Sequence, residues 1–504
     1  MKFNIQKNLS LLAAKNTLYN SLSTFISKVG GFVLTILLAR MLLPDLFGVY
    51  SLVLSIVVIV FSFIDLGIGE AAIRYMSESL GKNKRNEALS YFWYLFNVRF
   101  ILIIFGALGL FLFAKLFAYD IFGKQEIVIP LLFAIFFVLV NAVRNFFGIL
   151  FFALNDLRDV PFVYTILHGS KVLFSFIALL LFSGVEAVSA IFAAFAASSF
   201  VSLISIIIIL KRKKFRFFPK KKIKFNKKKT WEYLGFMSII NISLIMFGSV
   251  DTLMLGRFVD TSYVGYYHAA FSVIISLVAI FTISGIFLPI FTQVNGDRLK
   301  KAISKSMRYT LIISVPSVVG ILFVSEEIIS FFYGSEYSNA VGVLLALSLI
   351  LFVTPISSLY SNLLKAKDRT KILATITVMS LILNVVLNYI LITYFLKFSQ
   401  EYAIIGAALA TVISRTFLLV AVMADVKKQF KMALDNKPLL RSIIASAIMA
   451  LVLYIYEILF TEIAPIFSIL EVIIGVVTYF FVMVVIKEVN KEDLNLLKTT
   501  LKNY

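Results

Sequence analysis

Long apolar stretches dominate the chain and alternate with short polar segments rich in lysine and arginine. Runs of about 18 or more apolar residues recur along its whole length, and each can cross roughly 30 Å of hydrocarbon as an α-helix. The strands of a membrane barrel would alternate in polarity over about ten residues, and these runs do not alternate. The pattern therefore predicts an all-α polytopic membrane protein.

The positions of these runs predict fourteen spans. Six lie near 17–39, 48–69, 91–114, 127–151, 161–183 and 187–210. Six more lie near 232–256, 264–289, 309–331, 340–364, 372–396 and 402–424, and two follow near 441–461 and 464–486. They group into an N-terminal six-helix lobe at 1–210, a basic cytosolic linker at 211–230, a C-terminal six-helix lobe at 231–430, and a part with the last two helices and a cytosolic tail at 431–504.

The amino-acid composition limits the kinds of chemical site and partner that the chain can have. The absence of cysteine excludes disulfides, thiolate metal sites and a cysteine nucleophile, and the presence of only two histidines, His168 and His268, argues against a His-based metal site. A net charge of +21 would suggest nucleic acid in a soluble protein, but the positive-inside rule explains it here. With a cytosolic N-terminus, 38 of the 48 Lys and Arg residues fall in cytosolic segments and five in outer ones. We therefore expect a multi-pass protein of the cytoplasmic membrane, with both termini cytosolic and no nucleic-acid partner.

The linker carries the densest charge. Lys211–Lys229 holds 12 basic residues and no acid. Each base near an anionic leaflet contributes about 1 kcal/mol of attraction. We therefore expect this segment to bind anionic membrane lipids, with its interleaved phenylalanines at the interface.

An internal repeat appears when the chain is shifted by 217 positions. The shift places Arg40, Gly48 and Tyr50 on Arg257, Gly265 and Tyr267, at the turn after the first span of each lobe. It also pairs Ser21 with Ser238, Gly31 with Gly248, and Leu38 with Leu255. Two lobes related by duplication, with the substrate between them, are a standard transporter plan. The alternative is chance similarity between two apolar segments.

Short motifs near these turns resemble those of a known family. ARMLLPDLFGVYSLVLS and FIDLGIGEAAIRY in the first half, and VDTLMLGRF and GAALATVISR in the second, are similar to polysaccharide-biosynthesis flippases of O-antigen type. These flippases belong to the multidrug/oligosaccharidyl-lipid/polysaccharide exporter superfamily. The resemblance covers essentially the whole chain. It implies two lobes that open alternately and a lipid-diphosphate-linked oligosaccharide as substrate.

Five basic residues lie inside the predicted spans: Lys28, Arg99, Arg144, Lys171 and Arg415. A charge at mid-bilayer costs at least about 2.5–3.5 kcal/mol, so each side chain should face protein or water. A structural ion pair, or a long side chain reaching the headgroups, is the alternative to a binding role. Arg415 fits either interpretation.

Polar faces favour a binding role in the first lobe. Asn20, Thr24 and Lys28 follow helical spacing in the first span, and Tyr164, His168 and Lys171 share a face of the fifth. Only Asp65 is a clearly intramembrane acid there, so the bases outnumber their counter-charge. Diphosphate suits such a site, because arginine binds it bidentately and lysine as a point charge. Glu70 and Arg74, four residues apart, are interpreted as a local pair.

The second lobe offers oxygen ligands instead. Asp251, Asn384, Asn388 and Thr411 supply a carboxylate, amides and a hydroxyl, the set that a hard cation prefers. The resemblance implies a Na⁺ ion bound among these helices. H⁺ is the alternative coupling ion. Asn388 stands where some relatives carry an acid. Hydrogen bonding between helices is the alternative.

No GxxxxGK[ST] motif is present, and the outer loops of about ten residues leave no room for a catalytic domain. We therefore expect no enzyme and no other cofactor. The expected function is outward translocation of a polyprenyl-diphosphate-linked oligosaccharide, a surface polysaccharide precursor. A polysaccharide polymerase or glycosyltransferases are candidate partners. The alternatives are a cation-coupled multidrug exporter of the same superfamily, a lipid II flippase, or a non-transporting scaffold.

Overall fold

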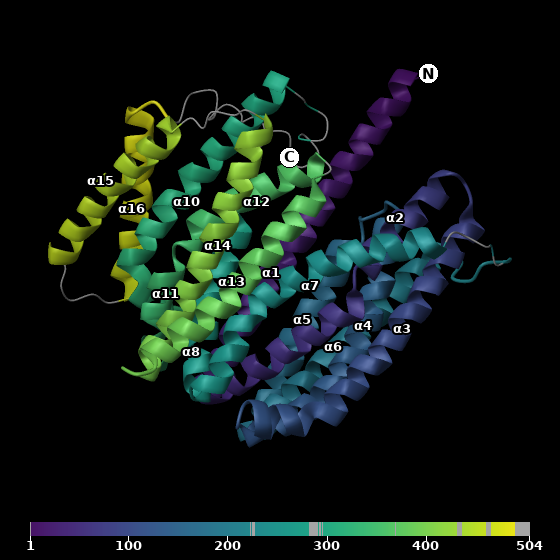
Figure 1. The fold of residues 1–504 in the computed structure, drawn as a ribbon, viewed down its shortest axis with the longest axis horizontal. Coiled ribbons are helices and arrows are strands. Elements are labelled where there is room, and N and C mark those ends of the chain that lie inside the picture. The colour runs from purple at the N-terminus through teal and green to yellow at the C-terminus, as the bar shows by residue number, and fades with distance from the viewer. Residues whose placement is uncertain are drawn as a thin grey trace. The chain divides into compact units, whose positions relative to one another are not determined.

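Every regular element in the described part of the chain is a helix (Figure 1). The computed structural model describes residues 2–221, 223, 227–281, 291, 294, 296–367, 369–430, 436–459 and 465–488. The first-half helices are α1 (Lys2–Asp65), α2 (Ile68–Gly81), α3 (Arg85–Lys115), η1 (Leu116–Ile121), η2 (Gln125–Ile127), α4 (Val128–Ala153), α5 (Val160–Leu181) and α6 (Gly184–Arg212). The others are α7 (Lys227–Phe258), α8 (Thr261–Phe281), α10 (Gly296–Tyr333), η3 (Ser335–Ala340), α11 (Val341–Leu347), α12 (Ile350–Ala366), α13 (Thr370–Phe395), α14 (Gln400–Phe430), α15 (Lys437–Leu459) and α16 (Pro465–Val485).

The helices agree with the predicted membrane spans. Helix covers most of the described part of every span. Within the described residues, ten helices are long and apolar enough to cross a bilayer. The pair Ser335–Leu347 and Ile350–Ala366, bent by 44°, makes an eleventh if it counts as one span. The all-helical membrane fold is thereby confirmed, whereas the number fourteen stays a prediction.

Helix α1 contains the first two predicted spans, joined through a kink. The kink lies at Leu43, whose φ is 60° and ψ 170°, and Pro44 follows. Proline lacks an N–H donor and its ring clashes with the preceding helical turn, so the helix cannot run straight through this point. The kink therefore lies at the turn that the sequence predicts between these spans.

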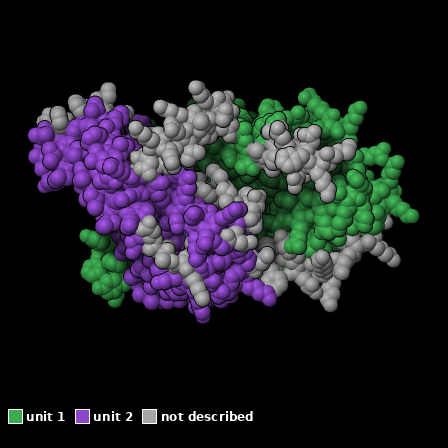
Figure 2. Space-filling model, turned by 90° about the horizontal axis from the view of Figure 1, so that it is seen from above, with its two compact units in different colours: residues 1–268, 392–404 green, residues 269–391, 405–504 purple. Residues whose placement is uncertain are grey.

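The described chain divides into two compact units (Figure 2). Unit 1 comprises residues 1–268 and 392–404, and unit 2 comprises residues 269–391 and 405–504. In unit 1, α6 packs against α4 and α5, and α1 packs along α5. In unit 2, α10 packs against α12 and α15, and α15 packs against α16. The lobe boundaries expected from the linker stay a prediction.

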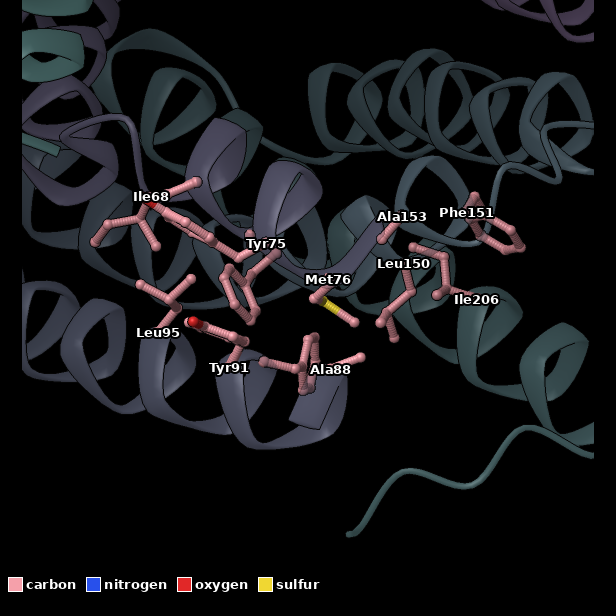
Figure 3. Close-up of a cluster of buried hydrophobic side chains, with 14 of the residues drawn as sticks. Ile68, Tyr75, Met76, Ala88, Tyr91, Leu95, Leu150, Phe151, Ala153 and Ile206 are labelled. Carbon is pink, nitrogen blue, oxygen red and sulfur yellow. The ribbon is translucent and has the colours of Figure 1, made fainter. Parts of the chain in front are cut away.

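A buried cluster in unit 1 fixes α2 and α3 against α4 (Figure 3). Tyr75 of α2 stacks on Tyr91 of α3 with ring centroids 5.2 Å apart. Met76 and Leu95 extend this contact, and Leu150 of α4 lies in the same cluster. Close packing of large side chains leaves these helices little freedom to shift. The cluster therefore sets where the polar groups of these helices lie.

Two glycines of unit 1 that the repeat aligns lie in contact with each other's helix. A Cβ on Gly48 would collide with the backbone of Thr261 and lie 3.1 Å from the nitrogen of Gly265. A Cβ on Gly265 would collide with the backbone of Pro44 and lie 3.2 Å from the nitrogen of Gly48. The shift of 217 that pairs the glycines also pairs Pro44 with Thr261. The contact is reciprocal, which supports an internal duplication, and it requires glycine on both sides.

In unit 2, one buried carboxylate joins three helices. Glu488, just after α16, has a side chain that is 4% exposed. It accepts from Nε of Arg308 in α10 at 2.9 Å and from Nη1 of Arg441 in α15 at 2.6 Å. A buried charge is tolerated only when it is paired in this way. The pairing holds the last two helices on α10.

The described part of the basic linker lies on unit 1. Phe215 and Phe217 are half-buried and pack against the cluster of α2, α3 and α4. The Trp93 indole donates to the Phe217 carbonyl at 2.7 Å, and Phe218 stacks on Trp93 at 4.8 Å. Phe215 and Phe217 thus contact the protein, and their place at the lipid interface stays a prediction. Part of the segment, including Phe225, lies outside the described residues.

Lys213 fixes the start of the linker. Its ammonium lies 2.5 Å from a carboxylate oxygen of Asp156 and 2.5 Å from one of Asp159, both in the turn between α4 and α5. Burial alone would lower the pKa of Lys213, but hydrogen bonds to the two carboxylates raise it overall. The lysine is therefore charged at neutral pH and holds the linker on unit 1.

Candidate functional site

The larger polar cavity of unit 1 has a volume of about 440 Å³. Asp65, Arg99 and Arg144 all line it, as the sequence predicts for an intramembrane charged site. Glu70, Asn145 and Tyr164 are its other polar side chains. Carboxylates and guanidinium groups thus share one cavity, with aromatic and aliphatic walls around them.

Arg99 and Asp65 form an ion pair in this cavity. Nη1 of Arg99 donates to Oδ1 of Asp65, and the two side chains are 5% and 29% exposed. Arg99 also lies over the ring of Phe146, 5.7 Å from its centroid. Asp65 ends α1, where Leu66 and Gly67 adopt positive φ angles of 42° and 73° and turn the chain into α2. This sharp turn places the carboxylate in the cavity.

Arg144 has neutral partners. Its Nε donates to the Ser202 hydroxyl at 3.1 Å, and its Nη1 donates to the side-chain amide oxygen of Asn145 at 2.9 Å. Its guanidinium lies over the Tyr164 ring, 5.1 Å from the centroid, and the residue is 4% exposed. Among the described residues no carboxylate lies within ion-pair distance of Arg144. Its charge is therefore held by hydrogen bonds and a ring, without a counter-ion.

A smaller cavity of about 130 Å³ adjoins the first. The two share Phe152, Val160 and Tyr164 as walls. Its polar lining comes from one face of α1: Asn20, Ser23, Thr24, Ser27 and Lys28. The polar stripe predicted for the first span is thus a cavity wall. Lys28 is exposed and has no ion-pair partner among the residues that the structure describes.

His168 and Lys171 lie beside these cavities rather than in their walls. His168 Nε2 is 3.1 Å from the Ser27 hydroxyl, and a Cβ on Gly30 would lie 2.6 Å from the His168 Cβ. The missing side chain at Gly30 therefore lets α1 and α5 approach. Lys171 is half-buried between the rings of Phe137 and Phe195, at 4.9 and 4.7 Å. No carboxylate within the described chain pairs with Lys171.

The predicted residues of unit 2 lie among polar neighbours. Nδ2 of Asn384 donates to the Thr411 hydroxyl at 3.1 Å, and Nδ2 of Asn388 donates to the Asn384 carbonyl at 3.0 Å. All three residues are fully buried between α13 and α14. Arg415 of α14 contacts the Thr354 hydroxyl of α12 at 3.5 Å. The structure therefore brings three of the four predicted ion-coupling residues together.

Asp251, the fourth of these residues, belongs to α7 in unit 1. It is 1% exposed and accepts from the Tyr267 hydroxyl at 2.7 Å. The nearby end of α7 is capped by Lys124, which donates to the carbonyls of Gly256 and Val259, each at 2.8 Å. Burial lowers the pKa of Lys124, although nearby acids act in the opposite direction. Lys124 therefore helps to fix the helix that carries Asp251.

Sequence reasoning missed the roles of Tyr164 and Glu70. Tyr164 separates the two cavities and lies against Arg144, and its helical spacing with His168 was the only signal. Glu70 lines the larger cavity and accepts from Asn241 at 3.3 Å. Its spacing to Arg74 predicted a local ion pair, so the sequence did not indicate that Glu70 lines this cavity.

The fold is that of a helical membrane transporter. The solved structure of the lipid II flippase MurJ in an inward closed conformation superimposes with a TM-score of 0.71 at 19% identity, over 93% of this chain and 98% of that one. The family model described as "Polysaccharide biosynthesis protein" matches residues 13–295, more than half of the chain, and the MatE model matches residues 237–390. The chain therefore belongs to the polysaccharide biosynthesis protein family, and it is a multi-pass membrane protein.

Two relatives come from Haloferax volcanii. The probable flippase AglR is 26% identical over 262 residues, which are 50% of this chain and 53% of that protein. The probable low-salt glycan biosynthesis flippase Agl15 is 27% identical over 196 residues, which are 38% of this chain and 40% of that protein. The chain thus matches about half of the length of these relatives, or less.

Proposed function

We propose that the protein is a flippase that moves a polyprenyl-diphosphate-linked oligosaccharide from the inner to the outer leaflet of the cytoplasmic membrane by alternating access. The observation that carries this proposal is the uncompensated positive charge of unit 1. Lys28, Arg144 and Lys171 have no carboxylate partner among the described residues, and Lys28 and Arg144 line adjoining cavities. Cations inside the membrane-spanning helices without counter-ions favour binding of an anion, and a diphosphate supplies that charge.

The acidic and amide side chains near these bases suit the sugar part of such a substrate. Asp65, Glu70 and Asn145 offer hydrogen-bond acceptors to sugar hydroxyls in the larger cavity, and Tyr164 offers a ring face. A cation-coupled multidrug exporter would be expected to present acids to a cationic drug, and bases without partners argue against that alternative. The names of AglR and Agl15 agree with a flippase, and that of Agl15 also with glycan biosynthesis. In this proposal the protein transports its substrate and catalyses no covalent reaction.

Reconstitution tests the function directly. The full chain in proteoliposomes is expected to move a fluorescent polyprenyl-diphosphate disaccharide between leaflets, measured as the fraction that an external reductant quenches over time. Protein-free vesicles and an R144Q protein should be much slower. A lipid II analogue and a cationic dye form the other arms. Transport of the dye alone, or a rate equal to that of empty vesicles, would contradict the proposal.

The basic linker is proposed to gather anionic lipid at the membrane surface. Lys214, Arg216 and Lys220 are exposed while the alternating Phe215 and Phe217 pack inward, so the bases point away from the protein. With about 1 kcal/mol per base, several such side chains would enrich anionic lipid near the transporter. This orientation requires the cytosolic placement that the positive-inside count predicts.

Serine at Lys214, Arg216, Lys220 and Lys221 is expected to slow transport several-fold in vesicles rich in anionic lipid and to change little in neutral vesicles. The reason is that only an anionic surface interacts with these charges. A matched protein with serine at Lys82, Lys84, Lys300 and Lys301 removes as much charge elsewhere. Equal slowing by both proteins, or an inverted topology by protease accessibility, would refute a local role for the linker.

A further inference from the structure

The ion pair between Arg99 and Asp65 differs from the other charges of the cavity. Within the described residues Arg99 is the one intramembrane base of the first half with a carboxylate partner. Its Nε is buried and has no hydrogen-bond partner there. A guanidinium carries five donors in a fixed fork that suits two acceptor oxygens at once. Arg99 therefore keeps donor capacity that Asp65 does not use.

Asp65 is a weakly held partner. It is the last residue of α1, and the exposed carbonyls at a helix C-terminus disfavour negative charge. Its side chain is 29% exposed, whereas that of Arg99 is 5% exposed. The carboxylate is thus the more exposed member of the pair, and both residues line the cavity. An anion that enters this cavity and binds the Arg99 guanidinium therefore competes with Asp65 for its donors.

We infer that Asp65 is the resident counter-ion of Arg99, and that an anionic headgroup must displace it in order to bind. This inference rests on the proposed function, because it assumes a diphosphate in the same cavity. With the cavity empty, Asp65 satisfies Arg99. With a diphosphate bound, the phosphate oxygens take over the guanidinium and Asp65 turns to solvent or to a sugar hydroxyl. When the substrate leaves, Asp65 returns and compensates Arg99 again.

This exchange lowers the affinity of the cavity for an anionic substrate. A carboxylate that competes for the same donors weakens diphosphate binding and speeds its release. Removing its charge should therefore tighten binding and slow turnover, which is opposite to the effect of removing a binding residue. The predicted signs for the two members of one ion pair are thus opposite.

The test measures binding of a polyprenyl diphosphate to the full chain in nanodiscs. We expect D65N to bind about tenfold more tightly than the wild type and to transport more slowly. We expect R99Q to bind about tenfold more weakly. Asp65 and Arg99 should be strongly coupled, so D65N adds no affinity when Arg99 is already glutamine. The D65N/R99Q double variant removes both charges of the ion pair and leaves neither one unpaired. It therefore tests the inference even if D65N alone folds poorly.

E70Q is the comparator, because Glu70 lines the same cavity and carries the same charge without pairing with Arg99 in the described structure. Its effect on affinity should be smaller and the same with or without Arg99. A different outcome is that D65N and E70Q raise the affinity for diphosphate equally, whether or not Arg99 is present. That result would show that only the total negative charge of the cavity matters, and it would overturn the proposed exchange. Weaker binding by D65N would make Asp65 a substrate contact and also overturn it. A wild-type protein that binds no diphosphate would refute the proposed function itself.

Discussion

Replacement of Lys28 by glutamine is expected to lower transport of a lipid-linked oligosaccharide about tenfold while the protein stays folded. Lys28 lines the smaller cavity and is exposed, without an ion-pair partner among the described residues. A charge-assisted hydrogen bond contributes about 1.5–3 kcal/mol, and about 1.4 kcal/mol corresponds to a factor of ten. Glutamine keeps much of the length of lysine and removes the charge.

The measurement is the initial rate of transport in proteoliposomes that contain equal amounts of folded protein. K15Q is the matched control, because Lys15 is exposed on the same helix and lines neither polar cavity of unit 1. It should transport at the wild-type rate. The binding role of Lys28 would be rejected if K28Q and K15Q transported equally fast.

Replacement of Asp251 by asparagine is expected to abolish the dependence of transport on a sodium or proton gradient. We propose Asp251 as the coupling carboxylate because it is buried in α7, where a bound cation or a proton would help to compensate its charge. Coupling free energies between two bound species usually correspond to changes of 5- to 150-fold. D251N should therefore lower gradient-driven transport about tenfold and leave the gradient-free rate similar.

Y267F provides the control for this experiment. It removes the hydrogen bond from Tyr267 to Asp251, 2.7 Å long, and keeps the carboxylate. We expect Y267F to remain gradient-dependent, with a shift in the ion concentration at half-maximal rate. The two gradients, applied separately, identify the ion. If D251N responds to both gradients as the wild type does, Asp251 has no role in coupling.

The amide and hydroxyl groups of unit 2 connect α13 and α14 through hydrogen bonds. Asn384, Asn388 and Thr411 form a buried hydrogen-bonded cluster, which agrees with both interpretations drawn from the sequence. Their oxygens could also serve a cation, because amide and hydroxyl oxygens are ligands that hard cations accept. Since they belong to unit 2 and Asp251 to unit 1, their contribution to coupling stays a prediction.

The periodicity of apolar residues was enough to predict the helices, because a bilayer forces each crossing segment to satisfy its own backbone hydrogen bonds. The polar stripe of Asn20, Thr24 and Lys28 was expected to line a cavity for a similar reason, since polar groups avoid lipid, and the structure places these residues along the smaller cavity. The repeat aligned Gly48 with Gly265, whereas their contact is known only from the tertiary structure.

The sequence alone thus determined the helical membrane class, the approximate span positions, the family resemblance and the set of intramembrane charges. Only the tertiary structure decided which charges pair. Arg99 and Asp65 are far apart in sequence and meet because the turn at Leu66 and Gly67 and the packing of α2 on α3 bring them together. Lys171 lies between aromatic rings for the same kind of reason. Helical spacing fixes only the face on which a residue lies, whereas its partner depends on how whole helices pack.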